Sequence, residues 1–141
     1  MRVIICGSRT WGTAAPEMTP FEVSRVAQER DAVFRVVELL QPDDLVIHGA
    51  ASGADTLASL YAKRRRDLRI QAHPAQWDLY GWRAGPIRNR AMLEIGKPDL
   101  VIYFTIDKDE PTTGTAHMVK IAKSAHVPVA YYRDYNGERY G

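Results

Sequence analysis

The chain has 141 residues, of which 45% are hydrophobic and 26% are charged, as is ordinary for a soluble globular protein of one domain. The formal net charge of +2 gives little support to nucleic-acid binding. One cysteine, Cys6, excludes a disulfide within the chain and a zinc site built from cysteine pairs. No apolar run is long enough for a signal-peptide core or a membrane span, so we expect an intracellular, cytoplasmic protein with no membrane partner.

The first predicted strand covers Arg2 to Cys6, an apolar run typical of a parallel strand buried on both faces. We expect Cys6 to be a small buried residue rather than a nucleophile. Gly7, Ser8 and Arg9 follow as a turn that carries a hydroxyl and a guanidinium. The connection that begins at residue 11 is long for a strand-to-helix loop. This length indicates that residues 11–29 are a lid or an insertion, and the alternative is a simple surface excursion.

A capping pattern at Thr19, Pro20 and Glu22 predicts a helix that begins here and runs towards Leu40. The side chains expected to pack on the sheet are Val33, Val36, Val37 and Leu40. Upstream of Asp31 the helix is mostly polar, so we expect that half to project from the domain or to meet another subunit.

A short apolar run that ends at Ile47 predicts the second strand, and a helical pattern resumes after Gly53. The turn between them contains Gly49, Ser52 and Gly53, and its glycines allow another group to come close. The free N–H groups of the following helix favour an anion at this turn. Asp55 lies there too, where it either complements the helix dipole or accepts a hydrogen bond from a ligand.

The basic run from Lys63 to Arg66 ends this helix, and it fits the negative end of the helix dipole better than a nucleic-acid backbone. Leu68 to Ala72 predicts a third strand. An irregular segment follows, and it is crowded with Trp77, Tyr80 and Trp82. Aromatic side chains in such a loop either stack on a base or cover the core beneath it.

Another helix is predicted to open at Ala84 and to end at Gly96. Its expected buried stripe consists of Ile87, Ala91 and Ile95. Arg88, Asn89 and Arg90 should lie in the first turn, where the helix dipole disfavours cations. A locally unfavourable cluster of this kind indicates a site that binds an anion or a carboxylate.

Asp99 to Phe104 and Val127 to Tyr131 predict the fourth and fifth strands. The last helix opens between them with three hydroxyl side chains around a glycine, a combination that suits a phosphate: Thr112, Thr113, Gly114 and Thr115. Residues 133–141 are polar, and we expect a flexible tail.

Strands and helices therefore alternate five times, which predicts one α/β domain over residues 1–141 with a parallel sheet. Ligands of such sheets bind outside the carboxyl ends of the strands. The turns at residues 7–9, 49–53 and 112–115 all follow strands at that edge. Together they predict a nucleotide-like, phosphate-bearing ligand, whereas no residue pattern predicts a metal ion or a cofactor.

Three stretches resemble the YspA-type branch of the SLOG superfamily: Ile5-Cys6-Gly7-Ser8-Arg9, residues 48–55, and residues 84–92 with their specific Gly-Pro-Ile-Arg-Asn run. Residues 75–81 match the pattern before that run. The resemblance covers most of the chain, with 11–29 as an expansion. It implies a Rossmann-like three-layer sandwich with strand order 3-2-1-4-5, a nucleotide-derived ligand and a homo-oligomer, most simply a dimer.

Three functions compete under this resemblance. The first is binding or sensing of a nucleotide or a nucleotide-derived, phosphate-bearing small molecule. The second is cleavage of nucleoside 5′-monophosphates at the N-glycosidic bond, as in the Lonely Guy phosphoribohydrolases of the same superfamily. The third is a single-stranded DNA-binding module similar to the DNA-processing protein A, which the small net charge disfavours.

The Lonely Guy enzymes carry a glutamate in a Pro-Gly-Gly-x-Gly-Thr-x-x-Glu motif. This sequence matches only Gly114-Thr115 of that motif and has Met118 at the glutamate position. A thioether can neither carry the charge nor accept a proton, so we expect binding with little or no hydrolysis. Asp55 is the nearest substitute for that glutamate by motif position, and His117 is a weaker one. Arg90 corresponds to the family's catalytic arginine, so Asp55 and Arg90 are the candidate catalytic residues.

The candidate site thus combines residues from every turn at this edge of the sheet. The candidates for binding a nucleotide or phosphate are Gly7, Ser8, Arg9, Gly49, Ser52, Gly53, Asp55, Arg88, Asn89, Thr113, Gly114 and Thr115, and those for stacking on a base are Trp77 and Tyr80.

Overall fold

Five parallel strands form the central sheet in the order β3-β2-β1-β4-β5, and the computed structural model describes all residues from 1 to 141. The strands are Arg2–Gly7 (β1), Leu45–His48 (β2), Arg69–Ala72 (β3), Leu100–Phe104 (β4) and Val129–Tyr131 (β5). The predicted strand order and the parallel pairing are confirmed. This order reverses direction between β1 and β4, so the carboxyl ends of these two strands frame the place where α/β sheets bind ligands.

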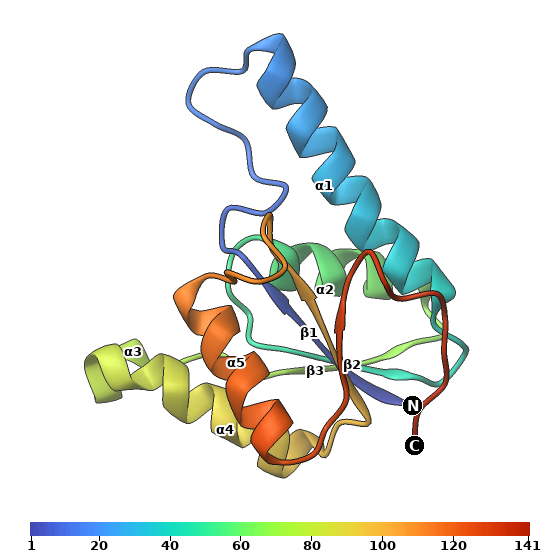
Figure 1. The fold of residues 1–141 in the computed structure, drawn as a ribbon, viewed down its shortest axis with the longest axis vertical. Coiled ribbons are helices and arrows are strands. Elements are labelled where there is room, and N and C mark those ends of the chain that lie inside the picture. Colours follow the sequence, from blue (N-terminus) through green and yellow to red (C-terminus); the bar gives the residue numbers. More distant parts are fainter.

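The helices form a layer on each face of the sheet, which confirms the three-layer sandwich. They are Pro20–Leu39 (α1), Ala54–Arg65 (α2), Trp77–Tyr80 (α3), Ala84–Gly96 (α4) and Thr113–Ser124 (α5), with one 3₁₀ turn at Gly81–Arg83 (η1). Figure 1 shows α4 and α5 in front of the sheet, with α1 and α2 behind it. None of the helices is both long and apolar enough to cross a lipid bilayer.

The core lies where strands β1, β2 and β4 pack against the two helical layers. Val3, Ile4 and Ile102 have no exposed surface, and the predicted face of α1 is buried as a whole. Complete burial of a side chain of this size contributes about 1.5–3 kcal/mol relative to exposure. Because these strands are apolar on both faces, the sheet is stable only when helices cover both of them.

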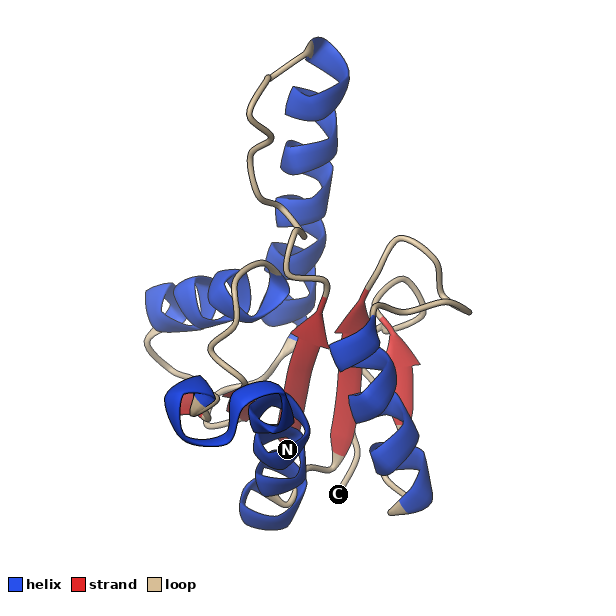
Figure 2. Cartoon of the chain, turned by 90° about the vertical axis from the view of Figure 1, so that its left-hand side faces the viewer, coloured by secondary structure: helices blue, strands red, loops and turns tan.

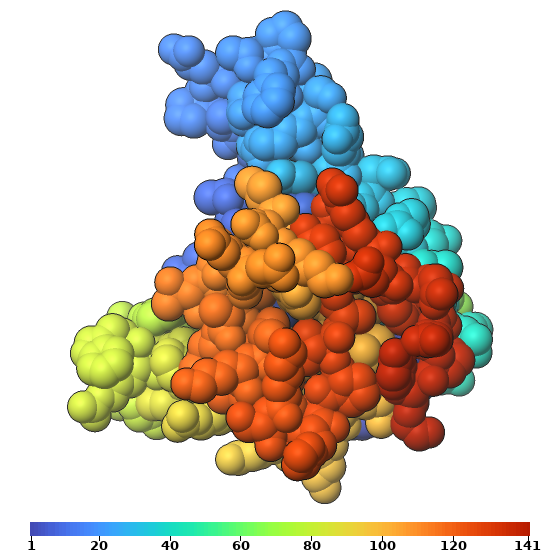
Figure 3. Space-filling model, viewed as in Figure 1, coloured from blue at the N-terminus to red at the C-terminus, as the bar shows by residue number.

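The first half of α1 projects beyond the sheet, as Figures 2 and 3 show. Thr19 caps it by accepting a hydrogen bond from the N–H of Glu22 (3.2 Å). The chain that precedes α1 is anchored at buried Trp11, whose Nε1 donates to the backbone oxygen of Glu29 (2.8 Å). Residues 11–29 thus form an outward extension, and none of them lines the cavity at the carboxyl ends of the strands.

The predicted buried stripe of α4 is wrong, because Ile87 and Ile95 are 41% and 62% exposed. The face that packs inward consists mainly of small residues and one methionine: Ala84, Gly85, Asn89, Met92 and Gly96. A Cβ on Gly96 would lie 2.9 Å from Cδ1 of Ile47. Because α4 approaches β2 this closely, branched side chains do not fit between them.

The chain after β5 has no helix or strand, yet it is bound to the body of the protein. Tyr135 is buried, and both oxygens of the Asp44 carboxylate accept hydrogen bonds from Arg139. Burial of Asp44 opposes ionisation, but the bonds from Arg139 and from the amine of Met1 outweigh it and hold the Asp44 pKa below its usual range. These contacts tie down part of the tail that we expected to be flexible.

Candidate functional site

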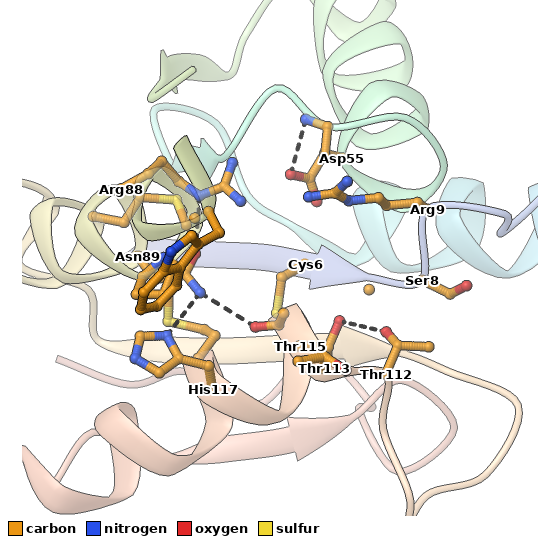
Figure 4. Close-up of a pocket in the computed structure, with 18 of the residues that line it drawn as sticks. Cys6, Ser8, Arg9, Asp55, Arg88, Asn89, Thr112, Thr113, Thr115 and His117 are labelled. Atoms are coloured by element: carbon orange, nitrogen blue, oxygen red, sulfur yellow. Dashed lines mark hydrogen bonds between the residues drawn. The ribbon is translucent and has the colours of Figure 1, made fainter. Parts of the chain in front are cut away.

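A cavity of about 760 Å³ opens at the carboxyl ends of the central strands, between α4 and α5 (Figure 4). Its volume lies in the range of small-molecule sites. Ten of the residues predicted for the site line it: Gly7, Ser8, Arg9, Asp55, Trp77, Arg88, Asn89, Thr113, Gly114 and Thr115. The other ten were not among the predicted site residues, although Thr112 belongs to the turn predicted to suit a phosphate and Trp82 to the aromatic segment: Cys6, Thr10, Ala51, Trp82, Gly85, Pro86, Met92, Thr112, His117 and Met118.

Five predicted residues do not line the cavity. Ser52 and Gly53 contact the turn after β1 instead. Ser52 donates its hydroxyl to the Arg9 backbone oxygen (3.0 Å), and a Cβ on Gly53, which has φ +81°, would lie 2.2 Å from the Ser8 backbone oxygen. Tyr80 and Arg90 are exposed outside it, so the structure does not bring the candidate catalytic arginine to the cavity. Gly49 does not line the cavity itself, but its backbone oxygen binds the Arg88 side chain, which does.

Arg88 fills the space that Gly49 leaves. Its Nη1 donates to the Gly49 backbone oxygen, and its Nε donates to Oδ1 of Asn89 (2.9 Å). A Cβ on Gly49 would lie 2.3 Å from Nη1 of Arg88, so any larger residue at this position would displace the Arg88 guanidinium. The expectation that Arg88 and Asn89 occupy the first turn of their helix is wrong, because α4 already begins at Ala84. Opposition to the helix dipole therefore does not explain this cluster.

Asp55 holds the glycine turn together from the start of α2. Its Oδ2 accepts hydrogen bonds from the N–H groups of Gly49 (3.0 Å) and Ala51 (3.3 Å). Burial raises the pKa of Asp55 to about 6, although the Ala51 N–H and Arg88 favour the ionised form. Figure 4 shows the carboxyl group beside Arg9, so Asp55 combines a structural role with a position at the cavity.

The turn after β1 brings a hydroxyl and a guanidinium to the cavity. Ser8 is held by its N–H, which donates to the Phe104 backbone oxygen (2.9 Å), and its hydroxyl shares a hydrogen bond with Thr10 (2.9 Å). Arg9 is exposed, and its guanidinium carbon lies 5.2 Å from the centroid of the Trp77 ring. The Arg9 side chain makes no hydrogen bond or ion pair within the fold, so it can turn to an anionic ligand at the cost of its contact with Trp77 alone.

The N-terminus of α5 offers unoccupied backbone donors. The first backbone hydrogen bond of this helix runs from the N–H of Ala116 to the oxygen of Thr112 (2.7 Å). The N–H groups of residues 113–115 precede it and have no partner within the helix. No acidic side chain lies in this turn, and a Cβ on Gly114 would meet no atom within 4 Å. This is the open, positively polarised helix end that binds phosphate in other proteins.

Asn89 connects α4 to this end of α5. Its Nδ2 donates to the backbone oxygen of Gly114 (3.2 Å) and to Nδ1 of His117 (3.1 Å), as the dashed lines in Figure 4 show. Its Oδ1 accepts the bond from Arg88. One buried amide thus sets the relative position of the glycine turn, α4 and α5.

Two indole rings border the cavity on α3 and η1. Trp77 is 45% exposed and Trp82 is 79% exposed. Such exposure excludes the alternative that these aromatic side chains cover the core. Arg83 lies beside Trp82, with 5.3 Å between the guanidinium carbon and the ring centroid. The rim therefore offers flat, partly hydrated surfaces next to cationic groups.

Cys6 lies in the cavity wall as a buried thiol. Its Sγ contacts the backbone oxygen of Ile102 (3.9 Å). Burial and the nearby Asp55 raise the thiol pKa far above its usual range. A thiol held in this protonated state is a poor nucleophile, as we predicted for Cys6.

The sheet order and the turns around this cavity define a Rossmann-like α/β protein. The model of the YspA, cpYpsA-related SLOG family matches residues 1–80, more than half of the chain, and the chain belongs to this family. The matched part includes the turns after β1 and β2 and reaches Trp77, whereas Arg88 and α5 lie beyond it.

Two comparisons extend over nearly the whole chain. The gene 61 protein of Mycobacterium phage D29 is 28% identical over an alignment of 137 residues, which covers 94% of this chain and 97% of that protein. The crystal structure of DNA processing protein A (DprA) from Streptococcus pneumoniae superposes with a TM-score of 0.63 at 17% identity. It covers 92% of this chain and 49% of the DprA chain, so our chain spans about half of that protein's length, and the likeness concerns the fold.

Proposed function

We propose that this protein binds a nucleotide or a nucleotide-derived, phosphate-bearing small molecule in the cavity between α4 and α5. One observation carries the proposal: the open N-terminus of α5, the guanidinium of Arg9 and the indole of Trp77 line the same cavity. Backbone N–H groups and arginine bind phosphate oxygens, while an indole ring stacks on a base. Membership of a SLOG family supports a nucleotide-related ligand.

Isothermal titration calorimetry of the full chain with AMP, GMP, CMP and UMP tests this proposal. We expect Arg9→Ala to weaken the best-bound nucleotide by about 1.5–3 kcal/mol, the range for a hydrogen bond to a charged group. Arg9 is a better probe than Arg88, because Arg88 also supports the turn at Gly49. Arg64→Ala, which removes an exposed cation on α2, is the matched control and should leave the affinity unchanged. Absence of binding to all four nucleotides at millimolar concentration would overturn the proposal.

Single-stranded DNA binding is the second candidate function, and the exposed rim favours it. Trp77 and Trp82 each lie beside an arginine, an arrangement that stacks successive bases of a single strand. A salt titration with an oligothymidylate separates the two functions, because affinity for DNA falls steeply with salt. Tight, salt-dependent binding that Trp82→Ala abolishes, together with poor binding of mononucleotides, would favour DNA.

Hydrolysis of the N-glycosidic bond has little support in the geometry. Met118 is buried at the position of the Lonely Guy glutamate, and Asp55 already accepts two backbone hydrogen bonds. The proposal therefore includes little or no release of free base from AMP, CMP, GMP or UMP, which chromatography measures. Multiple turnovers per minute would establish the hydrolase instead, and their loss in Asp55→Ala would identify its carboxylate.

The extension formed by residues 11–29 supports a homodimer as the working assembly. Phe21 and Val23 are exposed on the projecting half of α1, and they are apolar. This half makes few contacts with the body of its own chain (Figure 3). A second copy of the chain, which presents the same apolar side chains, is the partner that we propose for it.

A further inference from the structure

The hydrogen bonds around Asn89 determine which of its amide atoms is the oxygen. Arg88 can only donate, so the atom that its Nε contacts at 2.9 Å must be Oδ1 of Asn89. The backbone oxygen of Gly114 can only accept, so the atom 3.2 Å from it must be Nδ2. The two partners agree, and the amide has one possible orientation.

This orientation in turn determines the tautomer of His117. Nδ2 of Asn89 only donates, and it lies 3.1 Å from Nδ1 of His117, so Nδ1 accepts and carries no proton. A neutral imidazole with an unprotonated Nδ1 carries its proton on Nε2. Burial, with Arg90 and Lys120 nearby, lowers the pKa of His117 and so favours this neutral ring.

The Nε2–H group is left as a donor without a partner in the protein. The side chain of His117 lines the cavity, and the structure gives Nε2 no hydrogen bond. The Trp77 ring lies close to α4 at Gly85, where a Cβ would be 3.4 Å from the ring. Gly85 precedes Asn89 by one helical turn, so the Trp77 ring and the amide that contacts His117 lie along one face of α4, and His117 meets this face from α5.

We propose that His117 is a ligand-binding residue whose Nε2–H donates a hydrogen bond to an acceptor on a planar aromatic base stacked on Trp77. Asn89 is the positioning residue that holds this donor in place. This inference rests on the proposed function and narrows it. The ligand is a nucleotide whose base presents a carbonyl oxygen or an unprotonated ring nitrogen, and a sugar phosphate without a base lacks this contact.

Two variants of His117 and two classes of probe test the inference by calorimetry. His117→Phe keeps a planar ring and removes the donor, whereas the side-chain amide of His117→Gln restores a donor near the Nε2 position. Against the best-bound of AMP, GMP, CMP and UMP, we expect His117→Phe to weaken binding roughly 3- to 10-fold, the range for one neutral hydrogen bond. His117→Gln should retain most of the affinity, and ribose 5-phosphate should bind the wild type and both variants equally.

His126→Gln is the control, because it removes an exposed histidine beyond the far end of α5 and should change neither affinity. Equal losses of nucleotide and ribose 5-phosphate in His117→Phe would assign His117 a merely structural role and overturn the inference. Unchanged nucleotide affinity in His117→Phe would overturn it as well. If the wild type binds nucleotides no better than ribose 5-phosphate, the base contact is wrong while phosphate binding stands. If the wild type binds no nucleotide, the proposed function itself fails.

Discussion

The carboxyl group of Asp55 is buried at the cavity although its charge is costly there. Its pKa of about 6 lies above the ordinary value for an aspartate, so the folded protein binds the proton more tightly than the unfolded chain. The stability that this group contributes is complete at low pH and is lost as the pH rises through about 6. At neutral pH the ionised form therefore lowers the free energy of unfolding.

Asp55→Asn should for this reason stabilise the protein at high pH. The amide oxygen still accepts the bonds from Gly49 and Ala51, while the buried charge is gone. We expect a gain of roughly 1–3 kcal/mol near pH 8, because the Asp55 pKa of about 6 lies above its ordinary value, and a smaller gain near pH 4. Urea unfolding of both proteins at the two pH values measures it. If Asp55→Asn were less stable than the wild type near pH 8, the ionised carboxylate would stabilise the folded protein, and the prediction would be wrong.

At the scale of elements, the N-terminus of α5 permits a substitution that separates binding from folding. A Cβ on Gly114 would meet no atom within 4 Å, so we expect Gly114→Val to fit and to leave the urea midpoint nearly unchanged. Its branched side chain would occupy the space above the free N–H groups of residues 113–115. We expect nucleotide affinity to fall by about tenfold or more, or 1.4 kcal/mol, in calorimetry. Unchanged affinity in a folded variant would place the phosphate elsewhere.

Helix α1 depends on a cation supplied by α2. Nη1 of Arg65 donates to the terminal backbone oxygens of Val37 and Leu40, and its other nitrogens pair with Asp67. The basic run at the end of α2 thus contributes a cap for a neighbouring helix, beyond the dipole role predicted for it.

Arg65→Met keeps the aliphatic stem and removes the cap, so the carbonyl groups of Val37 and Leu40 lose a charged donor. We expect the free energy of unfolding to fall by about 1.5–3 kcal/mol. Arg64→Met, one residue earlier and exposed, should change it by less than about 0.5 kcal/mol, as is usual on surfaces. Equal effects of the two substitutions in urea unfolding would contradict the capping role.

For the whole molecule, the projecting half of α1 predicts the state of assembly. Phe21 is 74% exposed, and Phe21→Asp would place a charge in any interface formed there. We expect light scattering to give the mass of a dimer for the wild type at micromolar concentration and of a monomer for Phe21→Asp. Glu17→Gln, on the same extension, is the control and should remain dimeric. A monomeric wild type would contradict the prediction.

The fold was predictable because each strand is an unbroken apolar run between turn residues, and such runs alternate with helical segments. The inward face of α1 was predictable for a related reason, since Val33, Val36 and Val37 recur at helical spacing. The stripe of α4 was not predictable, because helical periodicity does not reveal that β2 lies close enough to require Gly96. The size of the side chain that fits at position 96 depends on the distance between α4 and β2, and this distance cannot be predicted from the sequence pattern.

The site was predictable where the chain itself makes the turn, as at Ser8 and Gly114. Residues that reach the cavity from elsewhere were harder to assign to binding. Trp82 belongs to a 3₁₀ turn that has no periodic pattern, and the pairing of Asn89 with His117 joins residues 28 positions apart. Gly49 was selected for a ligand, and the space that it leaves is taken by Arg88 instead.

The three tryptophans of the chain occupy two different environments. Trp11 is 3% exposed in the core, where it contacts Phe104 and Tyr132, whereas Trp77 and Trp82 stand at the rim of the cavity. Indole fluorescence shifts to longer wavelengths in water and is quenched by solutes that touch the ring. The molecule thus carries two optical reporters at its site and a reference within its core. A ligand that covers the rim will shield two of the three rings from acrylamide, so occupancy can be followed in unlabelled protein.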